Sequence, residues 1–172
     1  FVTLFFFFQA AEAQSFQFQP FTDVPVFKDA QALKQAWAGG MVTPQFGEID
    51  LNNDGLTDLV VFDRIDQSTT TWLRRIENGQ SVFKFAPAYA YKIPALRDWF
   101  VLIDFNNDGR TDLFTGSNGG ALVYENIGSV GNPLFRLRSN YLDAMWDFGF
   151  RAGILIMNID KTGIADFDGD GD

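Results

Sequence analysis

The chain has 172 residues, 22 of them acidic and 13 basic, a formal net charge of −9, and neither Cys nor His. The lack of these two residue types excludes disulfides, zinc–histidine sites and Ser-His-Asp or Cys-His catalysis within this segment. No basic cluster occurs, which argues against nucleic acid or an anionic membrane surface as a partner. The 20 Phe, 4 Trp and 4 Tyr can build the core of one ordinary domain.

The first thirteen residues predict a secretory signal peptide. Residues 1–8 are an apolar run rich in Phe, and Ala11-Glu12-Ala13 matches an A-x-A cleavage site. The charged region that normally precedes such a run is missing, and the chain ends inside a motif, so we expect a fragment. The run is far shorter than the ~20 residues of a spanning helix, so we expect no membrane-spanning segment after cleavage. This interpretation predicts a secreted or cell-surface protein whose mature form begins at Gln14.

Residues 14–43 form a lead-in with weak signals. Residues 28–38 favour a helix and are followed by Gly39-Gly40, a plausible stop. Their periodicity does not decide between helix and loop.

From Pro44 onward, short apolar runs with β-branched and aromatic residues predict strands in a repeating order. In the first unit, residues 44–98, we expect strands at 45–49, 59–62, 69–76 and 82–85. In the second, residues 99–163, we expect them at 99–103, 113–115, 121–124 and 134–137. A Glu-Asn pair follows the third run of each unit, as Glu77-Asn78 and Glu125-Asn126. Residues 141–163 match the first unit poorly and predict a longer linker with an entering strand at 154–156.

One motif, D-x-[DN]-x-D-G-x-x-D, links the first two strands of each unit. Residues 49–59 and 103–113 are identical at nine of eleven positions. A third copy begins at Asp166 and is cut off at Asp172. Ten acidic residues lie in these loops. Much of the net charge is therefore local, and bound cations would offset it.

The motif favours a calcium site. Oxygens at positions 1, 3 and 5 can converge on one side of a tight turn, Gly at position 6 allows the reversal, and position 9 closes the shell. An all-oxygen cage of this kind suits calcium better than zinc, copper or magnesium. The predicted ligands are Asp50, Asn52, Asp54, the Leu56 carbonyl and Asp58; Asp104, Asn106, Asp108, the Arg110 carbonyl and Asp112; and, in the third copy, Asp166, Asp168, Asp170 and Asp172.

An EF-hand and a plain turn are the alternatives for these loops. An EF-hand needs a Glu at position 12 and flanking helices, whereas this chain has Val61 and Thr115 there and strand-like flanks. Asp, Asn and Gly also favour ordinary turns between strands. The near-identical repetition of the whole motif favours calcium over plain turns.

These loops and their strand sets resemble the FG-GAP/VCBS repeats of the integrin α-subunit head and of exported bacterial proteins. Phe46-Gly47 echoes the FG element, whereas Phe100-Val101 does not. The resemblance implies an all-β fold: β-propeller blades, integrin α N-terminal-like, each of four antiparallel strands with a calcium loop between the first two. This chain would supply blades at 44–98 and 99–163 and the start of a third at 164–172, an incomplete ring. A β-sandwich with two coincidental loops is the alternative fold.

By this interpretation the chain is a non-catalytic calcium-binding scaffold for an unknown protein or glycan ligand, as in adhesion. The alternative is an accessory module of a larger exported hydrolase with its catalytic domain elsewhere. Five acids outside the loops are possible catalytic acids, and no pairing in sequence marks a dyad among them: Glu48, Asp63, Glu77, Asp98 and Glu125. We therefore expect no enzymatic activity from this segment.

Overall fold

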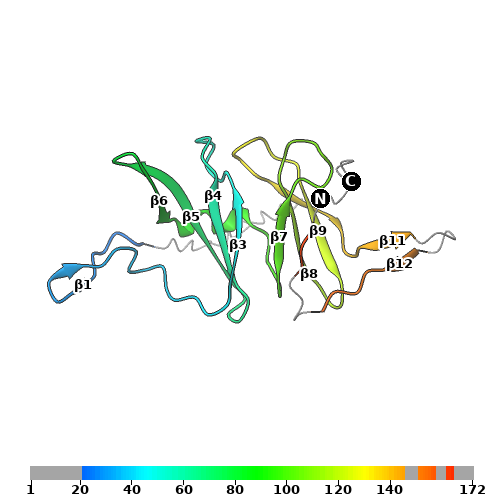
Figure 1. Cartoon of the computed structure of the whole chain (residues 1–172), viewed down its shortest axis with the longest axis horizontal. Coiled ribbons are helices and arrows are strands. Elements are labelled where there is room, and N and C mark those ends of the chain that lie inside the picture. Colours follow the sequence, from blue (N-terminus) through cyan, green and yellow to red (C-terminus); the bar gives the residue numbers. More distant parts are fainter. Residues whose placement is uncertain (1–20, 146–150, 158–161, 165–172) are drawn as a thin grey trace, which may run out of the picture.

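The computed structural model describes residues 21–145, 151–157 and 162–164. Two four-stranded antiparallel sheets stand side by side (Figure 1), each with its strands in sequential order. Sheet one contains β3 (Pro44–Ile49), β4 (Asp58–Asp63), β5 (Ser68–Glu77) and β6 (Gln80–Phe85). Sheet two contains β7 (Phe100–Ile103), β8 (Asp112–Gly116), β9 (Ala121–Asn126) and β10 (Phe135–Ser139). All eight predicted strands are confirmed, and each predicted end lies within two residues of the observed one.

Short turns set the register of both sheets. Asn78 and Gly79, with φ of 50° and 76°, form the two-residue connection between β5 and β6. Positive φ at both central residues suits the right-handed twist of a hairpin. In sheet two, the Ser117 N–H donates to the Gly120 carbonyl at 3.0 Å and closes the predicted turn between β8 and β9.

The main core lies between the two sheets. Its buried members include Val60 and Phe62 of sheet one and Phe100 and Leu113 of sheet two. The Phe62 and Phe100 rings meet edge to face, with centroids 6.2 Å apart. Gly47 of β3 makes this approach possible, because a Cβ there would lie 2.6 Å from Cε2 of Phe100. The FG element at 46–47 therefore lies at a close contact between the sheets.

A second cluster covers the opposite face of sheet two. Trp99, Phe114 and Val123 are buried there, and Ile156 and Ile164 from the following segment pack against them. Segments on both sides thus cover sheet two, as expected of an inner blade in a row.

The remaining elements are short. β1 (Phe27–Lys28) and β2 (Gln31–Ala32) form a small hairpin that overlaps residues 28–38. The sequence left helix and loop open for this segment, and the structure contains no helix there. The 3-10 helix η1 (Pro87–Lys92), which the sequence did not predict, connects the sheets. β11 (Asp143–Met145) pairs with β12 (Arg151–Gly153).

The expected strand at 154–156 is wrong. Residues 154–157 are irregular, and their backbone instead donates hydrogen bonds from Ile154 to Leu142 and from Ile156 to Gly119. The apolar run is explained by Ile156, which packs onto the second cluster without belonging to a sheet.

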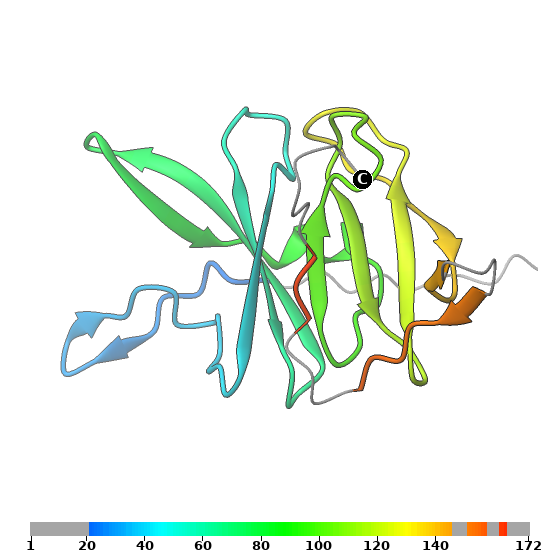
Figure 2. The same ribbon diagram turned by 45° about the vertical axis from the view of Figure 1, so that its right-hand side comes forward.

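The architecture is all-β, and its two four-stranded antiparallel sheets are consistent with blades of an incomplete β-propeller. Figure 2 shows the β3–β4 and β7–β8 connections at the same end of the two sheets. No helix among the described residues is long and apolar enough to cross a membrane. The predicted signal peptide at 1–13 and the third loop at 166–172 lie outside the described residues.

Candidate metal loops

The first candidate loop, residues 50–58 (loop one), is wound around the carboxylate of Asp50. Its Oδ1 accepts the backbone N–H groups of Asn52 at 3.1 Å and Asn53 at 2.8 Å, and its Oδ2 accepts that of Gly55 at 3.1 Å. Asn53 and Gly55 adopt the left-handed conformation, with φ of 62° and 78°. Asn and Gly tolerate this conformation best, which explains their place in the motif.

Asn52 and Asp54 continue the same pattern. Asn52 Oδ1 accepts the Asp54 N–H at 3.2 Å, and Asp54 Oδ1 accepts the Leu56 N–H at 2.9 Å. The hydrogen bond from the Asn52 amide, followed by that from the Leu56 N–H and by the charge of Arg75, lowers the pKa of Asp54. Asp54 is therefore ionised at neutral pH.

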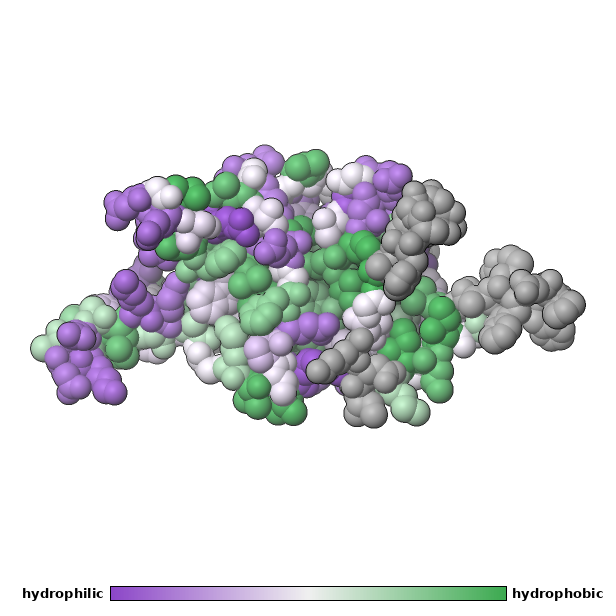
Figure 3. Space-filling view, viewed as in Figure 1, coloured by the Kyte–Doolittle hydropathy of each residue, from purple (hydrophilic) through white to green (hydrophobic). Residues whose placement is uncertain are grey.

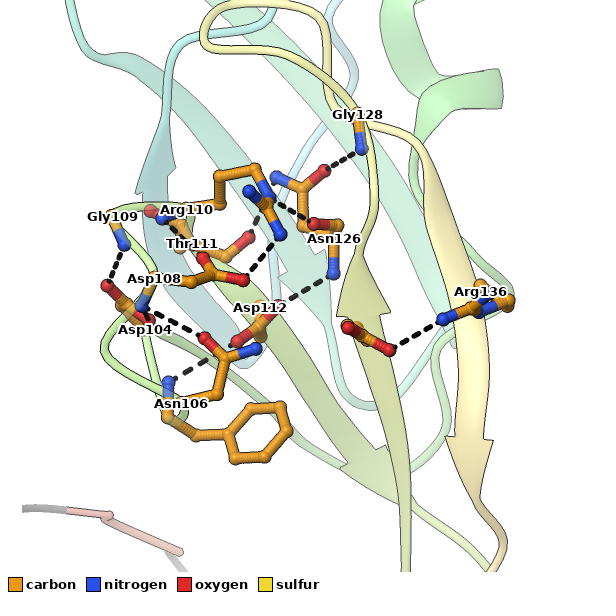
Figure 4. A network of polar contacts seen from close by, with 12 residues as sticks. Asp104, Asn106, Asp108, Gly109, Arg110, Thr111, Asp112, Asn126, Gly128 and Arg136 are labelled. Atoms are coloured by element: carbon orange, nitrogen blue, oxygen red, sulfur yellow. Dashed lines mark hydrogen bonds and ion pairs between the residues drawn. The ribbon is translucent and has the colours of Figure 1, made fainter.

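The second candidate loop, residues 104–112 (loop two), repeats this scheme (Figure 4). The two carboxylate oxygens of Asp104 accept the N–H groups of Asp108 at 3.1 Å and Gly109 at 2.7 Å. Asn106 Oδ1 also accepts the Asp108 N–H, and Asp108 Oδ1 accepts the Arg110 N–H. The two loops therefore share an internal hydrogen-bond scheme as well as a sequence.

The closing aspartates, Asp58 and Asp112, are fully buried and connect each loop to its sheet. Asp58 accepts the N–H groups of Leu51 and Arg74, both at 2.8 Å. Asp112 accepts those of Phe105 at 3.3 Å and Asn126 at 2.6 Å. Each carboxylate thus fixes the second residue of its loop to the third strand of the same sheet.

Burial raises the pKa of Asp58 and of Asp112, against the lowering effect of the N–H groups that each accepts. The other acids of the loops act in the same direction, Asp54 and Asp50 on Asp58, and Asp108 and Asp104 on Asp112. Each site thus concentrates negative charge that an added cation would relieve.

An arginine faces each central aspartate. Arg75 of β5 contacts Asp54 Oδ2 at 2.6 Å in loop one. In loop two the partner is Arg110, a member of the loop itself, which also donates through Nε to the Asn126 carbonyl at 2.6 Å. Neither guanidinium was predicted from the sequence as a partner of these carboxylates. Strand register places Arg75 there, and no motif signals it.

The donor set fits a hard cation in its chemistry. In each loop the first, third and fifth side chains carry oxygens that accept N–H groups of the loop backbone. The fifth also accepts from side chains, in loop one from the Asn52 amide and Arg75 and in loop two from Arg110. Among the described residues, no three Asp or Glu side chains form a ready group for a metal. The reason is that the closing aspartate of each loop turns toward backbone N–H groups and the third position is an amide. Metal ligation by these residues therefore stays a prediction.

The two Glu-Asn pairs noted in the sequence take different places in the two sheets. Asn126 donates its N–H to the closing aspartate of loop two, as Arg74 does in loop one. Asn78 instead lies in the turn after β5. β5 has ten residues and β9 has six, so the Glu-Asn pair lies farther along the third strand in sheet one than in sheet two.

The five acids outside the loops that the sequence offered as possible catalytic acids have separate partners. Asp63 accepts backbone N–H groups, including that of Ile65 at 3.0 Å. The others form ion pairs, namely Glu48 with Arg74, Glu77 with Lys84, Asp98 with Arg97, and Glu125 with Arg136.

Residues 50–115 match the model of the FG-GAP-like repeat family. The match begins at the first residue of loop one and includes all of loop two. It supports an FG-GAP repeat protein built as a propeller-like repeat module. No curated protein and no solved structure matches the chain.

Proposed function

We propose that this FG-GAP repeat module binds calcium through loops one and two and serves as a non-catalytic scaffold of a secreted or cell-surface protein. The observation that carries the proposal is the repetition of one hydrogen-bond scheme around Asp50 and Asp104, 54 residues apart. Plain turns need no such repetition of acceptor side chains. Export is supported by the signal-like residues 1–13, and N-terminal sequencing of the mature protein should then begin at Gln14.

In this proposal Asp50, Asn52, Asp54 and Asp58 hold one ion and Asp104, Asn106, Asp108 and Asp112 the other, with the carbonyls of Leu56 and Arg110. Calcium would supply charge neutralisation and tie each loop to its own sheet through the closing aspartate. The chain contains no disulfides, so such ions would take over part of their stabilising role.

The proposal is tested by calcium titration calorimetry on the 172-residue chain. We expect Asp54→Ala and Asp108→Ala each to remove one bound calcium, and the double variant to remove both. Asp66→Ala, an exposed acid outside the loops, is the matched control and should leave the titration unchanged. If each site binds at ~10⁻⁴ M, about 2 mM calcium adds roughly 1.8 kcal/mol per site.

Thermal unfolding in EGTA and in calcium gives the second readout. Two occupied sites should raise the midpoint by several degrees, and the double variant should abolish the rise. A folded chain with neither binding heat nor a shifted midpoint would overturn the proposal and leave the loops as turns.

A further inference from the structure

A groove of about 650 Å³ opens beside loop one. Its walls come from three separate parts of the chain, which are loop one, η1 and the β9–β10 connection at residues 127–134. Figure 3 shows mostly hydrophilic surface along the upper edge of the molecule, where loop one and the β9–β10 connection lie.

Specific contacts hold the walls together. The ammonium group of Lys92 donates to the Leu51 carbonyl at 2.5 Å and to Asn132 Oδ1 at 2.9 Å, and so joins η1 to both other walls. The backbone of Gly131 lies directly against Asn53, since a Cβ on Gly131 would be 2.3 Å from the Asn53 Cα. The groove is therefore formed without a ligand, which lowers the ordering cost of binding.

The groove is lined by both aromatic and polar side chains. Tyr91 is 81% exposed and Tyr89 is partly buried, so aromatic surface is offered to a ligand. Asn53, Asn132 and Ser129 add amide and hydroxyl groups. Aromatic surface combined with amides suits the apolar faces and the hydroxyls of a sugar ring.

Lys92 adds a positive charge to this lining. Its ammonium lies 5.6 Å from the centroid of the Tyr89 ring, and both of its acceptors are neutral. No carboxylate of the described residues forms an ion pair with it. An ammonium has three N–H groups, so one is left for an anionic ligand.

The acids of loop one have partners other than Lys92. Asp50 accepts three backbone N–H groups and Asp54 is paired with Arg75. The Lys92 ammonium is therefore not engaged by either carboxylate.

We propose that this groove binds an acidic glycan, a chain of uronic acid residues, through the Lys92 ammonium and the faces of Tyr89 and Tyr91. The inference deepens the proposed scaffold function by naming a ligand class, and it does not depend on calcium binding. The carboxylate of one sugar accepts from Lys92, and the ring hydroxyls exchange hydrogen bonds with the amides of Asn53 and Asn132.

The test is calorimetry of the 172-residue chain with two matched sugars, β-1,4-hexamannuronate and β-1,4-mannohexaose. Each sugar ring of the first carries a carboxylate where the second carries a hydroxymethyl group. We expect hexamannuronate to bind about ten-fold or more tightly than mannohexaose. Tyr91→Ala should weaken hexamannuronate binding by about ten-fold, whereas Tyr141→Ala, an exposed tyrosine outside the groove, should not. Lys92→Gln should remove the preference for the charged sugar.

A hexaglutamate peptide separates a glycan from an acidic peptide. Binding of hexaglutamate as tight as that of hexamannuronate would overturn the glycan assignment. Equal binding of the two sugars, no binding of hexamannuronate, or indifference to Tyr91→Ala would also overturn it. Calcium titration of the same preparations keeps the two proposals apart, because Tyr91→Ala leaves both loops intact.

Discussion

Loops one and two have nearly the same sequence and share several internal hydrogen bonds, but they have different attachments to the rest of the molecule. Loop one is held from sheet two and η1, by the backbone of Gly131 against Asn53 and by the Lys92 ammonium on the Leu51 carbonyl. Loop two is held to its own sheet, by the bond from Arg110 Nε to the Asn126 carbonyl. The shared residues thus fix the internal shape of a loop.

One of the two positions that differ between the loops accounts for the attachment of loop two. At position 7, Leu56 of loop one is replaced by Arg110 of loop two, which supplies the guanidinium for its own Asp108. Loop one takes that guanidinium from Arg75 of β5. In both loops a guanidinium pairs with the fifth-position Asp, but it comes from a strand in loop one and from the loop itself in loop two.

The largest expected effect tests what the loops share. Asp58→Ala and Asp112→Ala each leave two buried backbone N–H groups without their charged acceptor, and each should lower the free energy of unfolding by more than about 3 kcal/mol. Urea unfolding in EGTA measures this loss apart from any metal. The two losses should agree closely, and Asp66→Ala is the exposed-acid control. A loss under about 1 kcal/mol for either variant would show that the closing carboxylate is not what fixes that loop to its sheet.

Gly131→Ala should break loop one's attachment alone. The new Cβ would meet the Asn53 Cα at 2.3 Å, and the φ of 70° disfavours any side chain. We expect a loss of about 2–4 kcal/mol from clash and left-handed strain together. Gly79→Ala is the matched control, since its φ is 76° with nothing within 4 Å of the new Cβ, and it should cost only about 1 kcal/mol. Equal losses in the two variants would contradict the close contact.

Much of the fold could be predicted from local sequence. Alternating apolar residues between turn residues placed all eight strands, and the repeated motif placed both loops at their connections. η1 was not predicted because Pro87-Ala88-Tyr89-Ala90-Tyr91 has no periodic apolar face. The position of η1 depends on tertiary contacts. The prediction of a strand at 154–156 was wrong because an apolar segment can cover a hydrophobic cluster without pairing with another strand.

The candidate site was predictable in its residues but not in their orientation. Spacing shows that Asp58 belongs to loop one, yet only the register of β4 with β5 places the Arg74 N–H opposite its carboxylate. The groove beside loop one was not predictable, because Tyr91, Asn132 and Asn53 are brought together by the packing of two sheets. The role of Gly47 has the same origin, since the Phe100 ring that requires it lies in the other sheet.

Asp63 offers a smaller difference between the two sheets. It ends β4, and the equivalent place in sheet two is Ser117. Hydrogen bonds from backbone N–H groups, first that of Val42, lower the pKa of Asp63. A lowered folded pKa means that its contribution is fully present above the unfolded pKa of about 3.9 and is lost as the pH falls through the folded pKa. The difference in unfolding midpoint between wild type and Asp63→Asn should therefore shrink below about pH 4, whereas that for Ser117→Ala should not change. A difference for Asp63→Asn that holds constant to low pH would contradict the shift.

Arg110→Leu gives the smallest effect on stability and the sharpest test of the contrast, because it makes position 7 of loop two the same as in loop one. The variant loses the Asn126 bond and a half-exposed ion pair, so the free energy of unfolding in EGTA should fall by only about 1 kcal/mol. Removing a guanidinium from Asp108 also removes a charge that competes with a dication. Calcium affinity at loop two should therefore rise several-fold, and Arg75→Leu should do the same at loop one. Titration calorimetry measures both, with Arg136→Leu, whose partner Glu125 lies outside the loops, as the control. Weaker calcium binding by Arg110→Leu would mean that the guanidinium organises the loop for its ion, and the attachment that distinguishes loop two would then be part of its site.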